Sequence, residues 1–178
     1  MTSGIVLVDY DPDWPEQFEL EARHIRAVMG DSALRIDHVG STSVPGLKAK
    51  PIIDIQITVA APQPVAPHHK LLSQIGYQQL VIEPLDTTYP FFYKPQLWPA
   101  SHHIHLCAPG SVEERNHLLF RTFLSDHPEA AAEYATLKQT LADRYGGATQ
   151  QARECYSMAK SEFVNSVLCR ASTNGYQV

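Results

Sequence analysis

The apolar run at 52–59 constrains the fold most, because its residues alternate with the two-residue period of a β-strand. Ile53, Ile55 and Ile57 fall on one face, which we expect to enter the hydrophobic core. Asp54 and Gln56 share the opposite face. An unpaired charge is costly to bury, so Asp54 on a core strand needs a cationic partner. A lysine and a metal ion both meet that need.

The loop before this strand has the composition of a phosphate-binding turn. It begins with Gly40–Ser43, of which three residues carry hydroxyls, and it contains Lys48 and Lys50. Glycine lets the backbone approach a phosphate, hydroxyls donate to phosphate oxygens, and lysines neutralise charge. The pattern is neither a Walker loop nor a nucleophile elbow. The alternative is a plain connection between strands, in which Lys48 or Lys50 forms an ion pair with Asp54.

The rest of the chain favours an α/β or α+β domain, because strands and helices are interspersed before a long helical region. Ser111, with Glu114 three residues later, is a capping-box pattern that opens this region. The expected strands are 5–8, 34–39, 52–59, 77–82, 91–94 and 103–107. The expected helices are 13–29, a short one ending at 75, and 111–125, 128–145 and 148–170.

Composition excludes several classes of protein. Apolar residues make up 44% of the 178 residues, which is enough for a core, and the formal net charge of −5 disfavours bulk binding to polyanions such as nucleic acid. The cysteines at 107, 155 and 169 form no CxxC pair, so we expect a reducing cytoplasm. No stretch reaches the 18 apolar residues of a membrane span, and no secretory leader is recognisable.

Histidines cluster on the strand expected at 103–107. His103 and His105 are two residues apart, so their side chains share a face and can converge on one ion. Cys107 lies too far from His103 to complete a zinc site readily. The alternative is that these histidines are hydrogen-bonded structural residues, and His38 has the same two readings.

The chain resembles the GrpB family. The resemblance is carried by the run HVGSTSVPGL at 38–47 followed by KPIIDI at 50–55, and it extends over nearly the whole chain. The further matching positions are Tyr10–Pro12, Trp14, His103–His105, Phe120, Arg121, Tyr134, Leu137, Lys138, Tyr145, Tyr156, Lys160 and Phe163.

This resemblance implies a nucleotidyltransferase-like fold, related to polymerase β and kanamycin nucleotidyltransferase, with a mixed sheet, flanking helices and a helical C-terminal part. We expect a single domain with a core at 1–109, helices at 110–170 and a tail at 171–178. In some relatives the GrpB domain is fused to dephospho-coenzyme A kinase. The family's own activity is poorly defined, so the resemblance bears on fold more than on function.

In that superfamily a Gly-Ser pair binds nucleotide phosphates, and two carboxylates on the next strand bind divalent metal. Gly40 and Ser41 match the first element and Asp54 matches the first ligand, whereas Gln56 replaces the second carboxylate. A later strand, which carries a further carboxylate in the superfamily, offers His103 and His105. The resemblance therefore gives a metal set of Asp54, Gln56 and His105, and catalytic roles to Asp54, His103 and His105.

Basic residues complete the expected nucleotide site. One stripe at helical spacing consists of Tyr156, Lys160 and Phe163. Such a stripe usually packs against the core, with the lysine charge reaching outward. Lys160 would bind phosphate only if the stripe faced the cleft. The expected nucleotide-binding residues are Gly40, Ser41, Thr42, Ser43, Lys50, Arg121, Lys138 and Lys160.

The resulting expectation is ATP- and Mg²⁺-dependent nucleotidyl transfer to a small molecule. A carboxylate acceptor needs no base, so activation of an acid as an acyl-adenylate for amide ligation fits the loss of the second carboxylate at Gln56. A non-catalytic nucleotide- or coenzyme-binding module explains Gln56 equally well. The sequence leaves the acceptor and the oligomeric state open.

Overall fold

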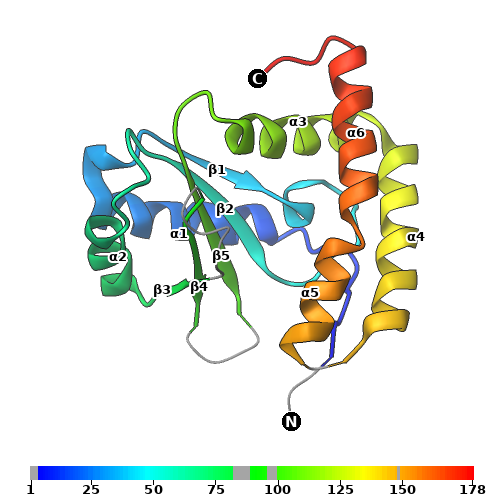
Figure 1. Cartoon of the computed structure of the whole chain (residues 1–178), viewed down its shortest axis with the longest axis horizontal. Coiled ribbons are helices and arrows are strands. Elements are labelled where there is room, and N and C mark those ends of the chain that lie inside the picture. The colour runs from blue at the N-terminus through cyan, green and yellow to red at the C-terminus, as the bar shows by residue number, and fades with distance from the viewer. Residues whose placement is uncertain (1–3, 82–88, 96–99, 148) are drawn as a thin grey trace.

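A five-stranded mixed sheet forms the centre of the molecule in the computed structural model, which describes residues 4–81, 89–95, 100–147 and 149–178 (Figure 1). The strand order is β1-β2-β5-β4-β3. β2 pairs in parallel with β5, and the other three pairings are antiparallel. The strands are β1 (Arg35–Val39), β2 (Ile53–Thr58), β3 (Gln78–Leu80), β4 (Phe91–Lys94) and β5 (His102–Cys107).

Within the described ranges, six α-helices and three short 3₁₀ turns flank the sheet, so the predicted mixed α/β class with a helical C-terminal part is confirmed. The helices are α1 (Trp14–Met29), α2 (Ala66–Leu72), α3 (Val112–Asp126), α4 (Pro128–Tyr145), α5 (Gln150–Met158) and α6 (Ser161–Thr173). The 3₁₀ turns are η1 (Gly30–Ser32), η2 (Ser41–Ser43) and η3 (Ser73–Ile75).

The two faces of the sheet differ in chemistry. The isoleucines of β2 lie in one hydrophobic cluster with Trp14 and Ile25 of α1 and Leu72 of α2. This cluster is the core predicted from the alternation in β2. The opposite face carries Asp54 and, across the parallel pairing, His103. Burial of the apolar face thus leaves the polar side chains of β2 and β5 for a site on the other face.

The helical C-terminal part packs on the loop that follows β1. Val44 and Leu47 of this loop share a cluster with Phe123 of α3, Tyr134 of α4 and Val167 of α6. In Figure 1, α4 and α6 run side by side next to the sheet, and α3 crosses at its upper edge. The loop from 40 to 50 is therefore held between the sheet and the helices.

Three local expectations differ from the structure, and a fourth is tested only in part. The strand expected at 5–8 is wrong, because this segment forms only an isolated bridge between Val8 and Ala49. The helix expected at 148–170 is divided into α5 and α6, since the N–H of Lys160 bonds to Ser157 three residues back and tightens the chain there. The end of the strand expected at 77–82 lies outside the described residues. The tail expected from 171 begins later, because α6 continues to Thr173.

Candidate functional site

Gly40 sits at the end of β1, where the chain passes closest to Asp54. Its φ of +69° and ψ of −168° belong to a region that only glycine readily adopts. A Cβ at this position would lie 2.4 Å from Oδ2 of Asp54, well inside contact distance. Glycine is therefore required here by both backbone conformation and space, and η2 begins directly against the carboxylate.

The hydroxyls of η2 have different uses. Thr42 is buried, and its Oγ1 donates to the carbonyl of Ile52 and contacts Nε2 of His38 at 3.0 Å. Ser43 Oγ donates back to the carbonyl of Gly40 at 2.6 Å. These two hydroxyls hold the turn in shape. Ser41 differs, because its Oγ accepts from a lysine of α4.

The partner of Asp54 is a histidine. Nδ1 of His103 donates to Oδ1 of Asp54 at 3.0 Å, across the parallel register of β2 and β5. Burial alone would raise the pKa of Asp54, but the hydrogen bond from His103, the nearby ring of His105 and the charge of Lys50 hold this pKa well below its usual range. Asp54 is thus an anion at neutral pH. The relative solvent exposure of its side chain is 28%, so a ligand can reach the carboxylate.

A cavity of about 310 Å³ opens over this pair, a size within the usual range for small-molecule sites. The cavity brings together the η2 turn, Asp54, two histidines of β5 (His103 and His105) and three lysines. The lining residues are Val39, Gly40, Ser41, Thr42, Ala49, Lys50, Ile52, Asp54, Phe91, His103, His105, His117, Lys138, Tyr156, Ser157 and Lys160.

The three lysines approach the cavity over tyrosine rings. Nζ of Lys160 lies 4.6 Å from the centre of the Tyr156 ring, Nζ of Lys50 lies 5.6 Å from the same ring, and Nζ of Lys138 lies 4.6 Å from the Tyr134 ring. Lys138 also donates to Ser41 Oγ at 3.1 Å. Lys160, in the tight turn between α5 and α6, therefore lines the cavity, and its binding of phosphate stays a prediction.

These lysines destabilise one another's charge. Burial and the neighbouring Lys160 lower the pKa of Lys138 to about 7, with Asp54 opposing the shift. Burial and the charge of Lys50 lower the pKa of Lys160 to about 8. Burial also lowers the pKa of Lys50. A cluster of partly buried cations next to a single carboxylate favours a polyanionic ligand, which would restore full protonation.

Three expected site residues lie apart from the cavity. The hydroxyl of Ser43 donates to the carbonyl of Gly40 within the turn, as described above. Gln56 is fully buried, and its Oε1 accepts from Nδ1 of His117 at 2.8 Å, so it does not face a metal beside Asp54. Arg121 donates from Nη1 to the carbonyl of His38 at 2.8 Å and braces the end of β1 instead of a phosphate. Which face of a helix or strand packs inward decided these cases, and spacing alone does not reveal it.

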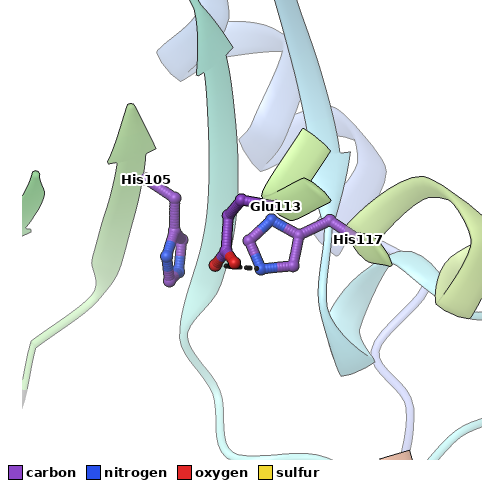
Figure 2. A group of neighbouring side chains, drawn as sticks. All are labelled: His105, Glu113 and His117. Atoms are coloured by element: carbon purple, nitrogen blue, oxygen red, sulfur yellow. Dashed lines mark ion pairs between the residues drawn. The ribbon is translucent and has the colours of Figure 1, made fainter. Parts of the chain in front are cut away.

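Glu113 and His117 of α3 are the site residues that the sequence analysis missed. Their ligand atoms lie within 4.8 Å of one another and of a ring nitrogen of His105 (Figure 2). His117 Nε2 is 3.2 Å from Glu113 Oε1. The hydrogen bond with His117 is the main cause that lowers the pKa of Glu113, and burial together with His117 lowers the pKa of His105 to about 3. The detectable signal was a Glu and a His four residues apart on the helix that follows the histidine strand.

A family model described as GrpB protein matches residues 4–170. The chain belongs to the GrpB family. The UPF0157 protein BH1888 of Halalkalibacterium halodurans is 36% identical over 170 residues, which is 96% of this chain and 84% of that relative. A crystal structure of the conserved protein GrpB from Enterococcus faecalis superposes with a TM-score of 0.83 at 30% identity, over 97% of this chain and all of that one.

Two more distant comparisons extend the family picture. A structure of the Cid1 poly(U) polymerase matches with a TM-score of 0.51 at 10% identity, over 77% of this GrpB chain and 45% of the polymerase, and this likeness shows the nucleotidyltransferase-like fold alone. A dephospho-CoA kinase of Mycolicibacterium paratuberculosis is 33% identical over 168 residues. The match takes in 79% of the GrpB chain and only 40% of that longer protein. Among the described residues, no helix is both long and apolar enough to cross a bilayer.

Proposed function

We propose that the cavity binds ATP with Mg²⁺ and supports transfer of the nucleotidyl group to a small molecule. The observation that carries the proposal is the meeting of the Gly40 turn, Asp54 and three lysines in one cavity. The fold supports it as well, because the structural neighbour Cid1 is described as bound to MgATP.

The basic side of the cavity suits a triphosphate. Lys50, Lys138 and Lys160 come from three separate segments and face the same space. Their mutual repulsion and desolvation are relieved when an anion binds, because each phosphate oxygen offers a charge-assisted hydrogen bond. In this proposal they hold the phosphates and stabilise the negative charge that develops on the departing pyrophosphate.

The residues present fit a magnesium ion held largely by its substrate. Mg²⁺ in phosphate sites is commonly bound by one or two carboxylates together with substrate phosphates. Asp54 provides one carboxylate, whose Oδ2 lies beside Gly40 and whose Oδ1 is oriented by His103. Bound there, Mg²⁺ would neutralise phosphate charge and polarise the transferred phosphorus.

A carboxylate acceptor agrees best with a single acidic residue. One of its oxygens would attack the α-phosphorus while the bond from that phosphorus to the bridging oxygen breaks, and pyrophosphate would leave with the electron pair. The product is an acyl-adenylate, which an amine would then convert to an amide with release of AMP. If the acceptor is an alcohol, its proton would pass to Nε2 of His103, which is free to accept because Nδ1 donates to Asp54.

A nucleotide- or coenzyme-binding module without turnover is the second candidate. One observation favours it, namely that Gln56 replaces a carboxylate and is buried with its oxygen bonded to His117. Such a module would use the same lysines and the same turn for binding.

Calorimetry with ATP and Mg²⁺ tests binding in the full chain. We expect Asp54→Ala to abolish the magnesium-dependent part of the affinity, and Asp37→Ala, on the neighbouring strand outside the cavity, to leave it unchanged. Release of pyrophosphate is then measured across a panel of small acids and alcohols. Magnesium-dependent binding that survives in Asp54→Ala would refute the metal assignment, and binding without pyrophosphate release under any acceptor would favour the module.

A further inference from the structure

We propose that His105, Glu113 and His117 form a binding site for a first-row divalent transition-metal ion, separate from the magnesium position at Asp54. The site goes beyond the proposed function, because it does not require that the protein bind ATP. It consists of one residue from β5 and two residues from the first two turns of α3, which follow each other directly in the chain (Figure 2).

The geometry is close to that of a metal site. One ligand atom from each residue lies within 4.8 Å of the other two. Ligand atoms around a tetrahedral ion at about 2.0–2.1 Å are roughly 3.4 Å apart, so side-chain movements of about 1 Å would bring the three atoms onto one ion. Figure 2 shows the ion pair that joins the Glu113 carboxylate to His117, with the His105 ring beside them, and the rings of His105 and His117 lie 4.9 Å apart in an edge-to-face contact.

The supporting framework fixes the two ligands on α3. Ser111 caps the helix by accepting from the N–H of Glu114 at 3.2 Å. The Glu114 carboxylate accepts from the N–H of Gly110 at 2.6 Å and from Thr58 Oγ1 at 2.8 Å, which ties the start of α3 to β2. Glu113 and His117 are one helical turn apart, so both side chains project from the same side of this anchored turn.

Gln56 determines which nitrogen of His117 is available. Its Oε1 accepts from Nδ1 of His117, so in the neutral ring the lone pair is on Nε2. Nε2 lies 3.2 Å from Glu113 Oε1, so it either carries a proton that it donates to that oxygen, as in the hydrogen bond described above, or offers its lone pair to a metal ion that takes the place of the proton. Metal-bound histidines typically donate their other N–H to a fixed acceptor. Gln56 is thus a positioning residue for the metal site, which accounts for an amide where a second magnesium carboxylate was expected.

The donor set selects the kind of ion. Two imidazoles and one carboxylate suit Zn²⁺, Fe²⁺, Mn²⁺ or Co²⁺, whereas Mg²⁺ prefers oxygen ligands alone. Three protein ligands leave at least one coordination position for water or substrate. That position faces the cavity, because His105 and His117 line it together with Asp54.

The zinc affinity of the protein tests the site. The whole chain is first stripped of metal with a chelator, and zinc binding is then measured in competition with a chromophoric chelator. We expect one tight site per chain, and more than roughly 100-fold weaker binding in Glu113→Gln and in His117→Gln, beyond the effect typical of an outer partner. The matched control is His24→Gln, whose half-exposed ring also pairs with a glutamate, at 3.3 Å, and should bind zinc as the wild type does. Wild-type affinity no greater than that of Glu113→Gln, or an equal loss in His24→Gln, would overturn the proposal.

Cobalt substitution identifies the ligand atoms. Co²⁺ in the wild type should give visible ligand-field bands without a thiolate charge-transfer band, and His105→Gln should lose them. A thiolate band would assign the ion to a cysteine and reject the site. Asp54→Ala should retain the cobalt spectrum even if it no longer binds ATP, which separates failure of this proposal from failure of the nucleotide proposal.

Substitution of Gln56 tests the positioning role. Gln56→Leu, of similar volume, should weaken zinc binding by about 10–100-fold, and Gln56→Glu should restore it because a carboxylate also accepts from Nδ1 of His117. Circular dichroism confirms that both variants are folded. Unchanged zinc affinity in folded Gln56→Leu would refute the role of Gln56.

Discussion

Gly40 is required both by the conformation of the backbone and by the space that the Asp54 carboxylate occupies. It ends β1 in a conformation with positive φ, and it leaves room for Oδ2 of Asp54 where any side chain would collide. The turn after it can then present Ser41 to Lys138. The family resemblance assigned Gly40 and Ser41 to phosphate binding, and the close approach to Asp54 supplies a physical reason for the glycine.

Replacement of Gly40 should therefore affect both stability and binding. Gly40→Ala is expected to lower the free energy of unfolding by roughly 1–3 kcal/mol, because alanine is strained at this backbone position and its Cβ displaces Asp54. Urea unfolding and ATP calorimetry measure the two effects. Gly46→Ala is the control, since Gly46 also has positive φ but open space around it. Equal loss of ATP affinity in both variants would contradict a specific role of Gly40.

The buried lysines predict that stability depends on pH. The pKa of Lys138 is about 7 in the folded chain against an ordinary value of 10.5, so above pH 7 the unfolded chain binds more protons and the free energy of unfolding rises with pH. We expect a rise of about 1–2 kcal/mol between pH 7 and 9, and a smaller rise in Lys138→Met.

Urea midpoints at pH 7, 8 and 9 test this expectation. The window ends at pH 9 because burial raises the pKa of Tyr134 and of Tyr156, which reverses the trend at higher pH. Lys70→Met, on the exposed surface of α2, serves as the control. A slope in Lys138→Met as steep as in the wild type would exclude Lys138 as its source.

At the scale of elements, the start of α3 connects the helical part to the sheet. The predicted capping pattern is half confirmed, because Ser111 accepts from the N–H of Glu114 but the Glu114 carboxylate accepts from the N–H of Gly110 and not from that of Ser111. The Glu114 carboxylate accepts instead from Gly110, Thr58 and Arg35. The Glu114 side chain, which the local motif predicts to cap the helix, thus connects α3 to the sheet, because Arg35 of β1 and Thr58 of β2 donate to its carboxylate.

Loss of this anchor should be costly. Glu114→Ala is expected to lower the free energy of unfolding by roughly 2–4 kcal/mol, because the side chain is buried and its donors lose their acceptor. Denaturant unfolding measures the change. Glu16→Ala, in the exposed first turn of α1, should cost less than about 1 kcal/mol. A similar small cost for Glu114→Ala would show that the anchor contributes little.

For the whole molecule, the helical part and the sheet share the loop between β1 and β2. Val44 and Leu47 are buried against α3, α4 and α6, and Lys138 reaches back from α4 to Ser41. Because the cavity is built from both parts, the two should fold as one cooperative unit.

Phe123 offers a test of this cooperativity. It is fully buried, 4.1 Å from the His127 ring and 5.2 Å from the guanidinium of Arg170. Phe123→Ala should lower the free energy of unfolding by roughly 3–5 kcal/mol and shift the far-UV and near-UV circular dichroism midpoints together. Exposed Val112→Ala on the same helix is the control. Separate midpoints for the two signals would contradict a single unit.

The sequence by itself determined the elements whose pattern is local. Isoleucine alternation predicted β2 and its buried face, helical spacing predicted α1, and the Gly-Ser pair marked the end of β1. The short run at 5–8 failed because β-propensity without a partner strand makes only a bridge.

Only the tertiary structure decided which side chains converge. Asp54 meets His103 through a parallel pairing between strands 49 residues apart, and α3 docks so that His117 contacts Gln56 while Arg121 turns to the carbonyl of His38. Register between distant strands and the docking face of a helix come from packing of the whole core, so no local pattern encodes them.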